Sequence, residues 1–389
     1  MKHRIRVLQQ KLLDGGIDVA LLFYSRDVLY YTGTAQPSCL SVTFDNYTLY
    51  VRSGLEFAVE DIFIGREKLV EERRLDKIVS GALMRMEGKP GRIGTELDIL
   101  TAEQFEGLHK LCPGMDFVNI SPITLAQRGV KEPEEITRLR RACDAVHAGH
   151  EAVLATLRAG VTELELAAAV ENAHRLAGHE GIFFIRLPDF FMSRGPIGAG
   201  PNLLRNSGVV YTITGVGLSP AVPAGPSRRP IQRGETVVVD IPTLVEGYHA
   251  DQTRTYCIGG AGKAIHALYD DLKAVADCLI GAIRPGMTGR DVFRMAQQKA
   301  DSLGRSEEFM SFGKGKSSRM IGHGIGLELN EPPILSEYET SALPDGCVVA
   351  LDMHMMAEGS GVVKLEDMIL VGGGGNEILT KSPRQLFEI

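Results

Sequence analysis

The chain has 389 residues, of which 44% are hydrophobic and 23% are charged, and its formal net charge at pH 7 is −7. This profile is typical of a globular protein of two or three domains, and a negative charge argues against nucleic-acid binding. No run reaches the ~18 to 20 apolar residues that a membrane span needs, and the N-terminal residues predict an amphipathic helix in place of a signal peptide. The six scattered cysteines form no Cys-x-x-Cys pair, so we expect reduced thiols in a soluble, cytoplasmic protein.

Apolar runs alternate with helical patterns in the first 125 or so residues. Residues 18–24, 47–51 and 91–96 are expected to form strands or strand edges, and residues 58–86 have a helical pattern. This alternation indicates an α/β domain. A long helix is expected over residues 131–160, with the domain boundary near residue 128, which predicts domains 1–128 and 129–389.

Two segments of the second part resemble each other. Residues 157–178 align without gaps to residues 283–304, and in both a threonine precedes a carboxylate by three residues, as in a helix capping box. The pairs are Thr162 with Glu165 and Thr288 with Asp291. The similarity is either chance between two helix starts or an internal duplication, whose halves would pack about a pseudo-twofold axis with a cleft between them.

Four carboxylates lie in or beside strand-like sequence. Asp240 ends the run TVVV, Asp251 opens DQTRT, Asp352 follows CVVAL, and Glu366 lies in VVKLEDMILV. A buried carboxylate is costly unless it is paired or binds metal, and a hairpin can place Asp240 opposite Asp251; surface or turn aspartates are the alternative. Together with His323, which glycines flank, this set suits a pair of divalent ions such as Mn²⁺, Co²⁺ or Zn²⁺, held ~3.5–4 Å apart.

This set resembles the two-metal site of the pita-bread metallopeptidases, which include prolidase, aminopeptidase P and methionine aminopeptidase. The segments GYHADQTRT, GHGIGLELNEPP and GVVKLED are similar to the motifs of that family. The resemblance implies that Asp251 and Glu366 bridge two metal ions, that Asp240 binds one of them, and that His323 and Asp352 bind the other. In such an enzyme a metal-bound hydroxide cleaves a peptide or peptide-like amide, as in Xaa-Pro dipeptidase and aminopeptidase P.

The resemblance also implies an architecture of mixed α/β (α+β) class. A creatinase-type α/β domain would precede a pita-bread domain, which has pseudo-twofold α/β halves and a curved antiparallel sheet with helices on its outer side. We expect a homodimer that acts on a small peptide or peptide-like substrate. The alternatives are a non-peptidase amide or amidine hydrolase of the creatinase type, which works without metal, and a binding protein that kept the fold and lost turnover.

Three positions depart from the family pattern. Ala224 and Asn330 stand where the peptidases have histidines, the latter of which helps to bind the substrate and stabilise the tetrahedral intermediate. Asp352 stands where they have a glutamate that binds metal and accepts the proton of the attacking water, and the shorter side chain could weaken or empty the position of its ion. Asp352, Asn330 and His323 are the candidate catalytic residues.

Three further residues are candidates for substrate binding. His249 and His354 each lie two residues from a ligand aspartate, so a regular strand would point them to the same face as that ligand. The alternative is that both are merely polar strand residues. For Arg254, in QTRT, an ion pair with a ligand carboxylate is the interpretation we favour over contact with the substrate.

Overall fold

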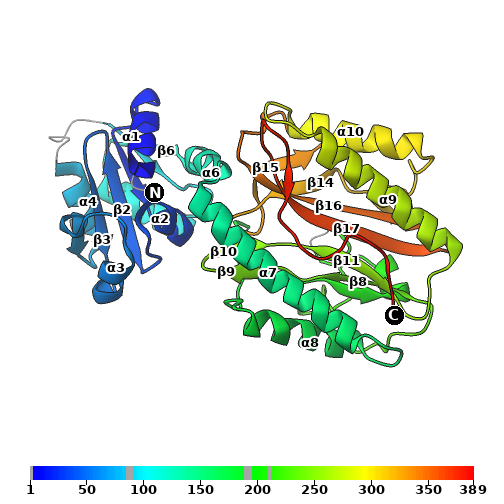
Figure 1. Ribbon diagram of the computed structural model, residues 1–389. Coiled ribbons are helices and arrows are strands. Elements are labelled where there is room, and N and C mark those ends of the chain that lie inside the picture. Colours follow the sequence, from blue (N-terminus) through cyan, green and yellow to red (C-terminus); the bar gives the residue numbers. More distant parts are fainter. Residues whose placement is uncertain (1–2, 85–90, 188–194, 209–211) are drawn as a thin grey trace. The chain divides into compact units, whose positions relative to one another are not determined.

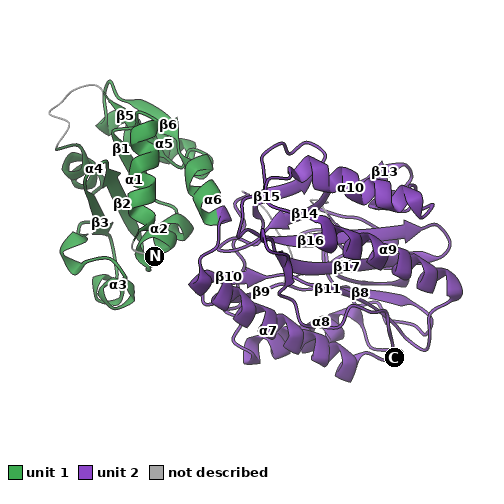
Figure 2. Ribbon diagram, turned by 45° about the horizontal axis from the view of Figure 1, so that its top comes forward, with its two compact units in different colours: residues 1–128 green, residues 129–389 purple. Residues whose placement is uncertain are grey.

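The computed structural model describes residues 3–84, 91–187, 195–208 and 212–389. The chain divides into two compact units, Met1–Arg128 and Gly129–Ile389 (Figure 2). No helix of the described residues is both long enough and apolar enough to cross a membrane. The six cysteines are all free thiols, and five of them are buried.

The first unit is a mixed sheet with helices packed on it. The strand order is β4-β3-β2-β1-β5-β6, in which β1 pairs antiparallel with β2 and parallel with β5. The strands are β1 (Val19–Leu22), β2 (Ser38–Thr43), β3 (Tyr47–Val51), β4 (Leu69–Glu71), β5 (Arg92–Thr95) and β6 (Asp116–Asn119). The helices are α1 (Arg4–Asp14), α2 (Ser25–Thr32), α3 (Leu55–Asp61), η1 (Arg66–Lys68), α4 (Leu75–Leu83), α5 (Ala102–Leu111) and α6 (Ser121–Gly129). The three strands predicted in this region are confirmed.

The predicted helix over residues 58–86 is wrong. Helix α3 ends at Asp61, and the chain then forms η1 and strand β4 before α4 begins at Leu75. β4 pairs in parallel with β3, so pairing with a distant strand overrides the local helical pattern. Residues 85–86 of the predicted helix lie outside the described residues.

The second unit is built on a large sheet whose main strands are antiparallel. Their order is β15-β14-β16-β17-β11-β8-β7, with β18 beside β17 and β19 beside β11. The strands are β7 (Ile197–Ala199), β8 (Thr236–Asp240), β9 (Thr243–Val245), β10 (Tyr248–Ala250), β11 (Thr253–Cys257), β12 (Ser311–Gly313), β13 (Lys316–Ser317), β14 (Met320–Gly324), β15 (Glu331–Ser336), β16 (Val348–Ala357), β17 (Gly361–Leu370), β18 (Glu377–Ile378) and β19 (Phe387–Glu388). The helices are α7 (Pro133–Thr156), α8 (Glu163–Leu176), η3 (Gly200–Leu204), α9 (Lys263–Ala282) and α10 (Gly289–Ser302).

The helices cover the apolar face of this sheet. In β16 and β17 the odd-numbered residues, such as Leu351, Met353, Val363 and Leu365, pack in one core with residues of α9 and α10. A second core joins α7 and α8 to β7, β8 and β11. Figure 1 shows the two helix pairs beside these two groups of strands. Because successive side chains of a strand alternate between faces, the even-numbered residues of β16 and β17 point to the opposite face.

The two helix pairs correspond element by element. Both predicted capping boxes form, in Thr162 with Glu165 at the start of α8 and in Thr288 with Asp291 at the start of α10, and each of these helices has 14 residues. A longer helix precedes each one, and each capping threonine makes an antiparallel bridge to a later segment. This correspondence favours duplication over chance similarity.

Candidate metal centre

Three of the predicted ligands lie in one row across the sheet, on the face opposite the helices. Thr253 of β11 is opposite Asp240 of β8 on one side and opposite Glu366 of β17 on the other. Glu366 is in turn opposite Asp352 of β16. Side chains opposite each other on one sheet face have Cβ atoms ~4.5–5.5 Å apart, so strand register alone gathers these carboxylates.

His323 and Asp251 join this row from two different positions. His323 of β14 is opposite Ala350, two residues from Asp352, and therefore points to the same face. Asp251 lies in the short connection between β10 and β11. The expectation that a hairpin places Asp240 opposite Asp251 is wrong, because β9 and β10 intervene and the residue opposite Asp240 is Thr253.

Three of the five residues can hold one metal ion together. Ligand atoms of Asp251, His323 and Glu366 all lie within 4.8 Å of one another, and all three residues are buried. The His323 Nδ1 lies 3.1 Å from the Gly324 carbonyl oxygen, to which it donates, so the lone pair of the ring is on Nε2. Glu366 accepts a bond from the Thr253 hydroxyl at 2.8 Å through Oε2, whereas its buried Oε1 has no hydrogen-bond partner among the described residues. Two carboxylates and one neutral imidazole suit a divalent ion such as Mn²⁺, Co²⁺ or Zn²⁺.

The electrostatics of these residues fit a bound cation. Burial, and then the neighbouring Asp240, raise the pKa of Asp251 well above its ordinary value. Burial, and then Asp251, do the same to the pKa of Glu366. Burial lowers the pKa of His323, which favours the neutral imidazole that a metal ion requires. A cation at this point offsets the repulsion between the carboxylates.

Lys364 is a site residue that the sequence analysis missed. Its Nζ forms an ion pair with the Asp240 carboxylate and lies 3.0 Å from Asp352 Oδ1 and 3.9 Å from Glu366 Oε2. Burial alone would lower the pKa of Lys364, but the three carboxylates raise it above its ordinary value, so the group is an ammonium ion. A signal was present in the sequence: Lys364 is two residues before Glu366 and so shares its sheet face, which is the same alternation that singled out His249 and His354.

His249 is buried, and its ring is held by backbone groups. Nε2 accepts a hydrogen bond from the Phe184 N–H at 3.0 Å, and Nδ1 lies 3.0 Å from the Gly326 carbonyl oxygen, to which it donates. These bonds tie together two segments that are far apart in the sequence. A role of His249 toward a substrate stays a prediction.

His354 lies beside the carboxylate row, directly opposite Lys364 in the register of β16 and β17. Its Nε2 donates to the Ser311 carbonyl oxygen at 2.9 Å, and its buried Nδ1 has no partner in the described part of the chain. Burial lowers the pKa of His354 to about 4, so the ring is neutral at pH 7. Its contact with a substrate likewise stays a prediction.

The two positions that lack the family's histidines are placed as follows. Asn330 is partly buried and comes directly before β15. Ala224 is buried and precedes Gly225, which bridges to Gly215.

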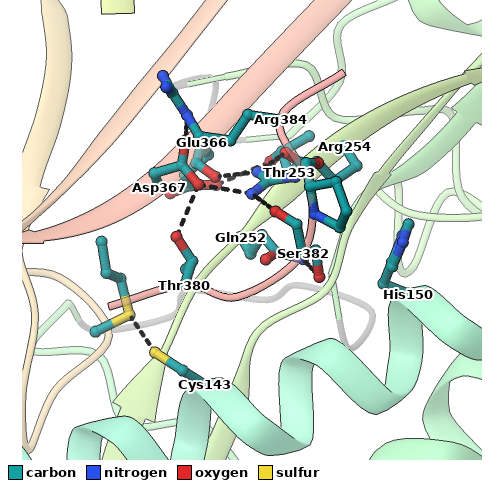
Figure 3. Close-up of polar contacts among 12 residues, drawn as sticks. Cys143, His150, Gln252, Thr253, Arg254, Glu366, Asp367, Thr380, Ser382 and Arg384 are labelled. Carbon is teal, nitrogen blue, oxygen red and sulfur yellow. Dashed lines mark hydrogen bonds and ion pairs between the residues drawn. The ribbon is translucent and has the colours of Figure 1, made fainter. Parts of the chain in front are cut away.

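Arg254 differs from both expectations for it. Its guanidinium is 1% exposed and pairs with Asp367, the neighbour of the ligand Glu366, instead of with a ligand (Figure 3). All five of its N–H donors are used, four toward backbone carbonyl oxygens and one toward a carboxylate: those of Pro383, Thr253, Glu366, Ser382 and Asp367, at 2.7–2.9 Å. Arg254 therefore holds the strands that carry the ligands and has no donor left for a substrate.

Comparison with known proteins shows which family the chain resembles. The model of the Metallopeptidase family M24 matches residues 137–372, and that of the Creatinase/Prolidase N-terminal domain matches residues 4–130. The Xaa-Pro dipeptidase of Pyrococcus furiosus is 26% identical over 391 residues, which cover 100% of both chains. The probable dipeptidase PepE of Mycobacterium tuberculosis is 28% identical over 302 residues, which cover 76% of this chain and 71% of that protein.

Solved structures show the same fold over the whole chain. The Xaa-Pro dipeptidase from Bacillus anthracis superposes with a TM-score of 0.83 at 24% identity and covers 100% of this chain and 99% of its own. The prolidase from Pyrococcus horikoshii OT3 has a TM-score of 0.80 at 25% identity, with 99% and 100% covered. The predicted creatinase-type domain and pita-bread domain are thereby confirmed, and a metallopeptidase family implies a divalent metal ion. The chain belongs to the Metallopeptidase family M24, as a member with a creatinase/prolidase N-terminal domain.

Proposed function

We propose that the protein is a metal-dependent hydrolase of the Xaa-Pro dipeptidase and aminopeptidase P type, acting on a peptide or a peptide-like amide. The observation that carries this proposal is the buried cluster of Asp251, His323 and Glu366, whose ligand atoms lie within 4.8 Å of one another. The similarity to Xaa-Pro dipeptidases over the full length of the chain supports the substrate class.

Asp251, His323 and Glu366 would hold the metal ion, and their oxygen and nitrogen donors suit Mn²⁺, Co²⁺ or Zn²⁺. A bound ion of this kind supplies Lewis-acid chemistry, because it polarises a carbonyl and lowers the pKa of water toward ~7. Thr253 orients Glu366 through the 2.8 Å bond to Oε2, which leaves Oε1 for the ion. Such outer contacts typically change metal affinity ~10–100-fold.

Asp352 is the candidate proton acceptor for the attacking water. Its Oδ1 contacts Lys364 at 3.0 Å and the Thr212 hydroxyl at 3.4 Å, whereas its Oδ2 has no hydrogen-bond partner among the described residues. Asp352 as a residue is 8% exposed, so most of its surface is buried. The Asn330 amide can donate a hydrogen bond to the substrate carbonyl in place of the family's histidine.

The missing histidines at Ala224 and Asn330 predict slow turnover of ordinary substrates. Loss of one donor to the developing oxyanion typically costs ~10²–10³ in rate. We therefore expect slow hydrolysis of Xaa-Pro dipeptides and a preference for a substrate that brings its own polar handle. We further propose that the protein is a homodimer, on the resemblance to the family.

The test combines elemental analysis with hydrolysis of Xaa-Pro dipeptides. We expect bound metal, slow cleavage, and loss of both in Asp251→Asn. The matched control is Asp270→Asn, which changes an exposed aspartate of α9 in the same unit. Cleavage that persists after complete removal of metal would favour a creatinase-type hydrolase. Metal binding without turnover of any peptide in a library would favour a binding protein.

A further inference from the structure

We propose that the Lys364 ammonium takes the place of a second metal ion, so that the site binds a single divalent ion at Asp251, His323 and Glu366. The other cation of the site is then built into the chain and neutralises Asp240 and Asp352. This inference rests on the proposed function only in requiring that one metal ion binds.

The contacts of Lys364 are those of a cation at the centre of a carboxylate group. Its Nζ forms an ion pair with Asp240, and lies 3.0 Å from Asp352 Oδ1 and 3.9 Å from Glu366 Oε2. A divalent ion binds carboxylate oxygens at ~2.0–2.2 Å. An ammonium group that donates to the same oxygens of Asp240 and Asp352 takes up that space and repels a divalent ion. One oxygen of each of these two carboxylates is therefore already paired with the ammonium group.

Lys364 cannot move away from these carboxylates at low cost. Its side chain is 0% exposed, and its backbone is held on both sides. The Lys364 N–H donates to the Thr255 hydroxyl at 2.9 Å, the same hydroxyl donates to the Lys364 carbonyl at 2.7 Å, and the residue opposite Lys364 in β16 is the neutral His354. A buried ammonium that lost its carboxylates would remain as an uncompensated charge, which is strongly destabilising.

Side-chain length agrees with one ion. Asp352 is one methylene shorter than a glutamate, so its carboxylate stays closer to the sheet, where the Lys364 side chain of the neighbouring strand reaches it. The departure at Asp352 and the buried Lys364 thus belong to one arrangement.

The experiment measures metal stoichiometry in the full-length protein. The protein is stripped with a chelator and titrated with Mn²⁺ by calorimetry, and the bound metal is counted by elemental analysis after desalting. We expect one Mn²⁺ per chain, with the electron paramagnetic resonance spectrum of an isolated ion. Lys364→Met should raise the stoichiometry to two and give the spectrum of a spin-coupled pair, whereas the charge-conserving control Lys364→Arg should stay at one.

Two ions per chain in the unmodified protein would overturn this inference and leave the proposed function standing, while no bound ion would overturn both. If Lys364→Met does not fold, two other variants decide. Asp251→Asn should weaken Mn²⁺ binding more than ~100-fold, beyond the usual effect of an outer contact, and Asp240→Asn less than ~10-fold. Equal losses in the two variants would show that Asp240 binds metal and would refute the assignment.

Discussion

Replacing Arg254 by lysine tests how the protein supports its candidate metal centre. The substitution keeps the positive charge beside Asp367 but removes the planar fork, and lysine has at most three donors where arginine has five. At least two of the five acceptors around Arg254 therefore lose their hydrogen bond.

The magnitude follows from the burial of these groups. A buried acceptor that loses its partner costs ~1–3 kcal/mol, so two of them cost ~2–6 kcal/mol. Asp367 keeps the Arg384 Nε and the Thr380 hydroxyl, each at 2.7 Å, so the loss falls on neutral carbonyl groups. We therefore expect about 3 kcal/mol of destabilisation, toward the lower part of that range. Since Nη1 also holds the carbonyl of Glu366 at 2.7 Å, metal affinity should fall as well, by ~10–100-fold.

Urea unfolding followed by circular dichroism measures the stability, because the chain has no tryptophan for fluorescence. Calorimetric titration with Mn²⁺ measures the affinity. The control is Arg140→Lys. Arg140 forms an ion pair with Glu377, and the two side chains are 44% and 50% exposed, so this substitution should lower the free energy of unfolding by less than ~1 kcal/mol. The reasoning fails if the free energy of unfolding of Arg254→Lys is within ~0.5 kcal/mol of that of the unmodified protein and its affinity for Mn²⁺ is the same.

Three further outcomes are expected. Burial lowers the pKa of His174 to about 4, so between that pH and ~6.5 the unfolded chain binds a proton that the folded chain does not. The free energy of unfolding should therefore decrease as the pH is lowered through this window, by up to about 3 kcal/mol from His174. His174→Gln should make the fall in the free energy of unfolding between pH 7 and pH 5 smaller, whereas the exposed His109→Gln should leave it unchanged; the same fall in His174→Gln as in the unmodified protein, measured by urea unfolding at both pH values, would contradict the assignment. Ala224→His and Asn330→His, combined with Asp352→Glu, should raise Xaa-Pro dipeptide hydrolysis, and turnover of ~10 s⁻¹ or more by the unmodified protein would refute this account of the departures. Sedimentation velocity should give the mass of a dimer, and a monomer mass would exclude it.

The sequence by itself determined the features that depend on neighbouring residues. The capping boxes at Thr162 and Thr288 join residues three apart, so the start of each helix is encoded where it forms. The strand pattern around Asp352 and Glu366 is equally local, because it depends only on alternation between the two faces of a strand. The order and spacing of the motifs, which match those of the family, then indicated the family and its fold.

The tertiary structure decided what depends on pairing between distant segments. Strand β4 forms within an apparently helical stretch because β3 is beside it. Thr253 is the residue opposite Asp240 because two short strands intervene in the expected hairpin. In both places local propensity is a weaker influence than the hydrogen bonds and side-chain contacts of the completed sheet.

Lys364 shows the same division at the site itself. In sequence it is one polar residue of a strand, and such a lysine is usually exposed to solvent. Only the register of β16, β17, β11 and β8 surrounds it with the carboxylates of Asp240 and Asp352, of which the former is 124 residues away along the chain. A charge can be buried when opposite charges lie beside it. Alternation along β17 places Lys364 on the same face as Glu366, but the aspartates beside it belong to strands that are distant in the sequence.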